Sequence, residues 1–119
     1  MIEYLAGFFD GEGCAHVTIR EYKGKRTISQ YITRTLVVSN NSREVCELFQ
    51  SELGGNVYQV RSGHYQWRAN NTDAIDAAIA LMPHIKLKRS QLQQLINGDK
   101  VSQLWTKVNA DSDKDCYGN

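Results

Sequence analysis

The chain has 119 residues, of which 41% are hydrophobic and one is proline, a composition that excludes a low-complexity linker and fits one globular domain. No run of about 18 apolar residues is present, which excludes a membrane-spanning helix. The three cysteines are widely spaced and include no Cys-x-x-Cys pair. This pattern argues against a disulfide framework and a zinc site, and it favours an intracellular protein. The net charge of +1 is uneven, because residues 109–119 carry three aspartates and one lysine, a charge of −2 that leaves +3 for the rest.

The first part of the chain predicts one helix and a long β-hairpin. A short helix is predicted over residues 2–11, where a pair of glycines ends it. Residues 15–20 and 28–38 alternate with the period of two that marks half-buried strands. The basic run Lys23–Arg26 lies between them as a hairpin tip. The positive charge of this part therefore lies in the predicted strands and their connection.

A second helix and a second hairpin follow. Asn41 is the predicted N-terminal cap of a helix, with Glu44 three residues later. The apolar residues of this helix recur at helical spacing, and two glycines end it. Strands are predicted over residues 57–61 and 64–69, on either side of Ser62-Gly63.

The remainder predicts helices and a polar end. Thr72 is the expected cap of a helix over residues 74–82, which Pro83 ends, and residues 87–96 form another helix. An amphipathic stretch from Val101 to Val108, including Trp105, comes next. We predict one domain over residues 1–108 and a polar, disordered tail over residues 109–119.

This order predicts an α+β fold, α-β-β-α-β-β-α with one further helix. Because a helix follows each of two hairpins, we expect a four-stranded antiparallel sheet with the helices on one face.

The alternation within the strands assigns side chains to the two faces of that sheet. The side chains expected to face the helices are Ala15, Val17, Ile19, Ile32, Leu36, Val38, Tyr58, Val60, Tyr65, Trp67 and Ala69. Arg34 breaks the pattern, since strict alternation points it inward; either it lies near the sheet edge and extends outward, or the register differs there by one residue.

The opposite face is rich in Arg, Gln, Thr and His and has almost no carboxylates. Such side chains read base edges and phosphates in the major groove of DNA. An ordinary solvated sheet face is the alternative. The predicted DNA-binding residues, with the hairpin tip, are His16, Thr18, Arg20, Lys25, Arg26, Tyr31, Thr33, Thr35, Gln59, Arg61, His64, Gln66 and Arg68.

The first helix carries a possible interface and an acid. Gly7 and Gly11 are four residues apart, a spacing that lets two helix backbones approach closely. If two copies pack these helices about a two-fold axis, their Glu12 carboxylates converge as oxygen ligands for a divalent cation such as Mg²⁺. The alternative is a glycine-rich helix end inside a monomer, with Asp10 and Glu12 solvated. The predicted dimer interface is Leu5, Ala6, Gly7, Phe8 and Gly11.

The nonapeptide Leu5-Ala6-Gly7-Phe8-Phe9-Asp10-Gly11-Glu12-Gly13 resembles the LAGLIDADG signature of homing endonucleases. It has Phe-Phe for Leu-Ile, Gly for the second Ala and Glu for the second Asp. The segment from Pro83 to Gln91 is similar to the family's Pro-hydrophobic-Lys-x-Lys stretch, so the resemblance covers residues 2–96.

The resemblance implies a single-motif member that acts as a homodimer through the first helix. A saddle-shaped sheet would bind the major groove of a long, partly palindromic double-stranded DNA site, and cleavage with Mg²⁺ would leave 3′ overhangs. Mn²⁺ is expected to substitute, and Ca²⁺ to bind without supporting cleavage.

The resemblance also implies roles for individual residues. Glu12 and Gly11 take the metal-binding positions, Lys88 that of the basic catalytic residue, and Asn40 the position where many members have a water-positioning Gln. Arg43 or Arg89 is a candidate contact for the scissile phosphate.

Two other classes stay open. One is a non-cutting DNA- or RNA-binding relative, such as an intron maturase with intron RNA as a partner, or a regulator. The other is a structural dimer without catalysis. Glu12 and Lys88 together favour cutting, because a pure binder does not need a buried carboxylate beside phosphates.

Overall fold

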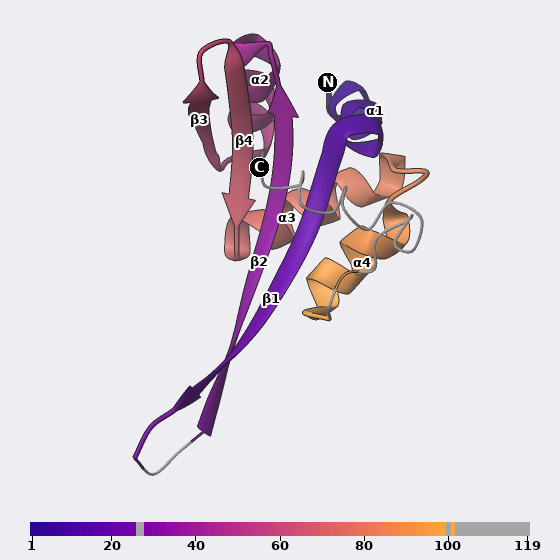
Figure 1. The fold of residues 1–119 in the computed structure, drawn as a ribbon. Coiled ribbons are helices and arrows are strands. Elements are labelled where there is room, and N and C mark those ends of the chain that lie inside the picture. Colours follow the sequence, from indigo (N-terminus) through magenta and orange to yellow (C-terminus); the bar gives the residue numbers. More distant parts are fainter. Residues whose placement is uncertain (26–27, 100, 102–119) are drawn as a thin grey trace, which may run out of the picture.

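A four-stranded sheet and the helices on one of its faces make up the described part of the chain (Figure 1). The computed structural model describes residues 1–25, 28–99 and 101. The predicted tail, Trp105 and Arg26 lie outside these residues. The elements in order are α1 (Ile2–Glu12), β1 (Gly13–Lys23), β2 (Ile28–Asn40), α2 (Arg43–Leu53), β3 (Asn56–Arg61), β4 (His64–Asn70), α3 (Thr72–Leu81), a 3-10 turn (Met82–His84) and α4 (Arg89–Asn97).

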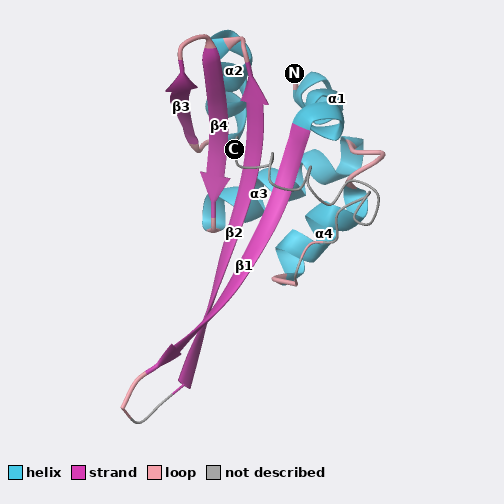
Figure 2. Cartoon of the chain, in the orientation of Figure 1, coloured by secondary structure: helices cyan, strands magenta, loops and turns pink. Residues whose placement is uncertain are grey.

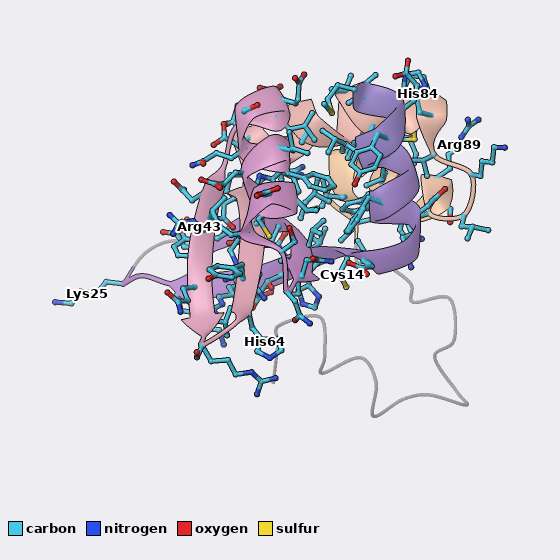
Figure 3. All side chains as sticks on the ribbon, turned by 90° about the horizontal axis from the view of Figure 1, so that it is seen from above. Cys14, Lys25, Arg43, His64, His84 and Arg89 are labelled. Carbon is cyan, nitrogen blue, oxygen red and sulfur yellow. The ribbon has the colours of Figure 1, made fainter. Side chains whose placement is uncertain are left out.

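The sheet is antiparallel throughout, with the strand order β1-β2-β4-β3. Seen from above, the helices lie on one side of the strands (Figure 3). The predicted α+β fold and the order of its elements are therefore confirmed. In the described residues, no helix combines the length and apolar character that crossing a membrane requires.

The core lies between the sheet and the helices, and alternation explains most of it. Six of the side chains predicted to face the helices are buried there: Ala15, Val17, Leu36, Val38, Trp67 and Ala69. Large apolar residues from the helices meet them, among them Leu5, Phe9, Phe49, Leu81, Leu92 and Leu95. This layer holds α1 and the ends of β1 and β2 in fixed positions.

Two side chains of the first hairpin that were predicted to face the helices follow the alternation but are not buried. Ile19 is 49% exposed and Ile32 is 40% exposed. They are paired with each other in the ladder, beyond Thr35, where the pairing of β2 with β4 begins. Figure 2 shows this part of β1 and β2 as a two-stranded ribbon that projects past the helices. The period-two pattern cannot indicate where the supporting layer ends.

The register of β3 also differs from the prediction. Tyr58 is 46% exposed and Val60 is 49% exposed, whereas Val57 lies opposite the buried Trp67 and packs against the core. Gln59 is paired with Tyr65, so it belongs to the helix side of this edge strand. An irregularity between Gln59 and Arg61 then brings Arg61 opposite His64.

Arg34 points toward the helices, as strict alternation requires, and the register at this position is regular. Its Nε donates to the carbonyl of Leu95, 2.7 Å away, near the C-terminal end of α4. A cation is favourable there because the last carbonyls of a helix lack partners and carry partial negative charge. Gly98, with φ +80°, ends α4, and a Cβ on it would lie 2.6 Å from Arg34 Nη2. The inward arginine is thus a cap for α4.

Two predicted helix caps are displaced by one residue. Ser42, and not Asn41, caps α2, because its Oγ accepts a hydrogen bond from the backbone N–H of Val45. Asn71 precedes α3 in place of Thr72, and its Oδ1 accepts from the backbone N–H of Arg34.

Cys46 is a free thiol, and it is fully buried.

Candidate functional site

The end of α1 is tied to the segment that precedes α4. The carboxylate of Asp10 accepts hydrogen bonds from three consecutive backbone N–H groups: Lys86 at 2.7 Å, Leu87 at 3.1 Å and Lys88 at 3.1 Å. Bonds of this kind to an ionised acceptor are stronger than those between neutral groups. Asp10 is therefore an anchor between two segments that are more than 70 residues apart in the sequence, and this use occupies both of its oxygens.

The side chain of Lys88 binds back to the end of α1. Its Nζ donates to the carbonyl of Phe9, 3.3 Å away, and to the carbonyl of Gly13. The ammonium group also lies 5.8 Å from the centroid of the Phe9 ring. Burial lowers the pKa of Lys88, and the carboxylates of Asp10 and Glu12 partly oppose this shift. A positive charge is thus fixed at the helix end that precedes β1.

Gly13 is needed at this junction because a Cβ there would overlap the ring of Phe9. Phe9 is fully buried, so the ring cannot move aside. The glycine lets α1 change directly into β1 and leaves Glu12 exposed at the last position of the helix.

Glu12 is bonded to the end of β2. Asn40 Nδ2 donates to Glu12 Oε2 over 2.8 Å, and Asn40 Oδ1 accepts from the backbone N–H of Ser42 over 2.7 Å. The pairing of Gly13 with Val38 in the ladder explains why these residues meet, since Glu12 and Asn40 extend past that pair. The three predicted catalytic residues, Glu12, Asn40 and Lys88, therefore converge at the end of α1.

One copy of the site offers a metal ion only part of a ligand set. Among the described residues, no three His, Cys, Asp or Glu side chains form a group that could hold a metal. Glu12 is an exposed oxygen donor, and the adjacent Gly11 carries a backbone carbonyl. Oxygen donors suit a hard cation such as Mg²⁺, which needs near-octahedral coordination and keeps several waters. The residues fit such an ion if further oxygens come from elsewhere.

The predicted DNA-binding residues are only partly exposed. Arg20, Lys25, Tyr31, Thr33 and Arg61 are exposed, and His16, Thr18, His64 and Arg68 are half-buried. Figure 3 shows Lys25 far from the body of the domain and His64 on the side of the sheet away from the helices. These nine residues are at least partly accessible, and their assignment to DNA binding stays a prediction.

Three other residues predicted on this surface are placed differently by the structure, two of them by burial and Gln59, although exposed, by the face on which it lies. Thr35 and Gln66 are only 6% and 4% exposed, because they lie on the central strands with neighbours on both sides. The Thr35 hydroxyl donates to Asn70 Oδ1, and Gln66 Nε2 donates to Ser39 Oγ. Gln59 lies on the helix side of β3, as its pairing with Tyr65 shows.

Sequence reasoning missed a groove beside Asn40. It runs from the end of β2 to the turn between β3 and β4, and its lining includes Ser39, Asn41 and Val60 as well as Arg61 and His64. The signal available was the polar run that ends β2. The irregularity in β3 between Gln59 and Arg61, beside which Val60 is exposed, has no signal in the alternation of the sequence.

The exposed face of α1 differs from the predicted interface. Leu5 and Ala6 are fully buried in the core of their own chain, so they are unavailable to a second copy. Among the residues of α1 that stay wholly or partly exposed, Tyr4, Gly7, Phe8 and Gly11 have the i, i+3, i+4, i+7 spacing of one helix face. A Cβ at Gly7 or Gly11 would meet nothing within 4 Å. Packing inside one chain therefore does not explain these glycines.

The two arginines proposed for the scissile phosphate lie on opposite flanks of the helix layer (Figure 3). Arg43 Nε is 3.8 Å from Glu47 Oε2 on α2, and Arg89 Nη2 donates to the carbonyl of Ile85 over 3.4 Å.

Comparison with known proteins bears on both the fold and the motif. The model of the LAGLIDADG endonuclease family matches residues 5–101. A probable intron-encoded endonuclease, aI2, of Debaryomyces hansenii is 27% identical over 101 residues, which are 77% of this chain and 15% of that protein. The chain thus spans about 15% of the length of this curated relative.

Solved structures share the fold. The homing endonuclease I-CvuI, in a complex with the I-CreI target and Mg, superposes with a TM-score of 0.68 at 23% identity, over 81% of this chain and 63% of that one. The homing endonuclease I-TnaI gives 0.67 at 18% identity, over 82% and 69%. The archaeal intron-encoded homing endonuclease I-Vdi141I, complexed with DNA, gives 0.63 at 20% identity, over 81% and 64%.

Replacing Asp10 tests the connection between α1 and α4. Asp10→Ala should lower the free energy of unfolding by about 1–3 kcal/mol, because three backbone N–H groups lose a charged acceptor. Asp76→Ala, at an exposed position of α3, is the control and should change it by less than about 0.5 kcal/mol. Urea unfolding followed by circular dichroism measures both, and equal values for the two variants would contradict the anchoring role.

Proposed function

Because the chain belongs to the LAGLIDADG endonuclease family, we propose that it is a sequence-specific double-strand DNA endonuclease that acts as a homodimer with divalent metal ions. The observation that carries this proposal is the convergence of Glu12, Asn40 and Lys88 at the end of α1. An acid, an amide and a half-buried cation meet there beside a polar sheet face. The DNA complexes of I-CvuI and I-Vdi141I, which have the same fold, support DNA as the substrate.

Glu12 is the metal ligand in this proposal, with Gly11 beside it. The remaining oxygens come from the DNA phosphates and the partner's Glu12, since a single chain supplies too few. A bound Mg²⁺ would activate water and stabilise the leaving oxygen of the phosphodiester. We expect Mn²⁺ to substitute and Ca²⁺ to bind without cleavage; the crystallisation of I-CvuI with Mg and with Ca supports divalent ions in general.

Lys88 contributes a positive charge that the fold has already positioned. An ammonium group has three N–H donors, and the carbonyls of Phe9 and Gly13 take two of them. The third donor is left for a phosphate oxygen near Glu12. A cation held in this way needs no rearrangement as negative charge develops on the phosphate.

The outer sheet face is the DNA-binding surface. The β1–β2 ribbon carries Arg20, Lys25, Tyr31 and Thr33, and a two-stranded ribbon fits the major groove. Two copies related by a two-fold axis would read two half-sites, so we propose a long, pseudo-palindromic target cut to leave 3′ overhangs. In the described residues, no observation favours the non-cutting DNA- or RNA-binding alternative.

Dimerisation is proposed through the α1 face formed by Tyr4, Gly7, Phe8 and Gly11. The two glycines allow close backbone approach, and the rings of Tyr4 and Phe8, with centroids 6.1 Å apart, flank them. This face is the corrected form of the predicted interface, without Leu5 and Ala6.

Glu12→Gln tests the metal ligand. It should abolish cleavage in Mg²⁺ while leaving the affinity for the DNA target in Ca²⁺ within roughly tenfold, because it removes a charge and little volume. Glu3→Gln, at an exposed position on the same helix, is the matched control. A Glu12→Gln protein that cut DNA as fast as the control would rule out this mechanism.

Gly7→Leu tests the dimer face. It should shift the dimer to monomer in sedimentation velocity, because a large side chain separates the two helices. The monomer should stay folded, since Leu favours helix by nearly 1 kcal/mol over Gly and the position is open within the chain. Ala80→Leu, at an exposed position of α3, is the control. An unchanged sedimentation coefficient for Gly7→Leu would remove this face from the proposal.

A further inference from the structure

The side-chain amide of Asn40 has a determined orientation. Its Oδ1 lies 2.7 Å from the backbone N–H of Ser42, and its Nδ2 lies 2.8 Å from Glu12 Oε2. The Ser42 group can only donate and an ionised carboxylate can only accept, so the amide cannot be turned around without losing both bonds. Both polar ends of Asn40 are therefore engaged within the chain.

Asn40 is also held on a rigid part of the fold. It ends β2, where its pair in the ladder is Tyr65, and it precedes α2, whose cap is Ser42. Glu12, in contrast, is an exposed glutamate at the end of a helix. An exposed glutamate loses up to about 2 kcal/mol of side-chain entropy when it is fixed. The bond from Asn40 restricts the carboxylate before any ion binds.

The lengths of the two side chains are matched across this contact. Glu contributes two methylene groups and Asn contributes one, so three methylenes and one hydrogen bond span the distance between the two backbones. Asp at position 12 with Gln at position 40 would contain the same three methylenes. Either change alone would leave the span one methylene too short or too long.

We infer that Asn40 and Glu12 form one length-matched unit, in which Asn40 is a positioning residue that aims the Glu12 carboxylate at the metal. This inference rests on the proposed function of Glu12 as a metal ligand. It gives Asn40 a role beside the water-positioning one that the resemblance implies, because one of its two amide N–H donors is directed at Glu12.

A double-mutant cycle tests the pairing. The proteins are the full-length wild type, Asn40→Gln, Glu12→Asp and the double variant. Affinity for Mn²⁺ is measured on the DNA-bound protein from the electron paramagnetic resonance signal of the free ion, and the cleavage rate is measured in Mg²⁺. Each single variant should bind Mn²⁺ about 10–100-fold more weakly, as loss of an outer-shell partner does. The double variant should recover part of this loss, because it restores the span between positions 12 and 40 although not the bond to Ser42.

Three controls distinguish a loss of Glu12 positioning from unfolding and from loss of the metal site itself. Asn41→Gln lengthens the exposed neighbouring amide and should leave Mn²⁺ affinity unchanged. Thermal unfolding checks that each variant folds, and Glu12→Asp leaves the bond from Asn40 to Ser42 intact in any case. Glu12→Gln reports on the metal site itself.

Two results would overturn the inference while leaving the proposed function intact. One is an Asn40→Gln protein that binds Mn²⁺ as the wild type does, while Glu12→Gln loses binding. The other is a double variant whose loss is the product of the two single losses, which is the behaviour of independent residues. If wild type and Glu12→Gln bound Mn²⁺ equally, the proposed metal site would fail, and the inference with it.

Discussion

The reciprocal hydrogen bonding between Asp10 and Lys88 is the constraint on which the site depends. The Asp10 carboxylate holds the backbone that precedes α4, and the Lys88 ammonium holds the carbonyls at the end of α1. Neither contact would form without the other segment, because each residue binds the backbone around its partner. The position of Glu12 follows, since it lies within the segment that Lys88 spans, between Phe9 and Gly13.

The rest of the sheet extends outward from this fixed point. Gly13 begins β1 opposite Val38, so the same junction sets the register of the long ribbon and brings Asn40 to Glu12. The ribbon extends well beyond the helices (Figure 2), and its sequence includes the basic and aromatic residues Arg20, Lys25 and Tyr31. The proposed DNA-binding surface and the proposed cutting site are thus joined through continuous secondary structure. Under the proposed function, recognition at the ribbon would fix where on the duplex the Glu12 carboxylate lies.

Local patterns were enough to predict the elements but not all of their faces. The strands followed from alternation, and the motif linked Glu12 to Lys88. The exposed face of α1 could not be predicted, because Leu5 and Phe8 are equally apolar and only the tertiary contacts distinguish them. The face of β3 could not be predicted, because Val57 and Tyr58 are adjacent apolar residues and only the pairing of Val57 with Trp67 distinguishes them. The bond between Asn40 and Glu12 joins residues 28 apart in the sequence, so no local pattern indicates it.

The most direct measurement of the central claim is selection of cut sites from a randomised DNA duplex library, in Mg²⁺ and again in Ca²⁺. Cleavage of a roughly palindromic sequence in Mg²⁺, with 3′ overhangs and no cutting in Ca²⁺, is the predicted result, because two copies would each present Glu12 to one strand. Enrichment of a sequence that is bound but cut in neither ion would contradict the account and identify the chain as a DNA-binding protein without nuclease activity.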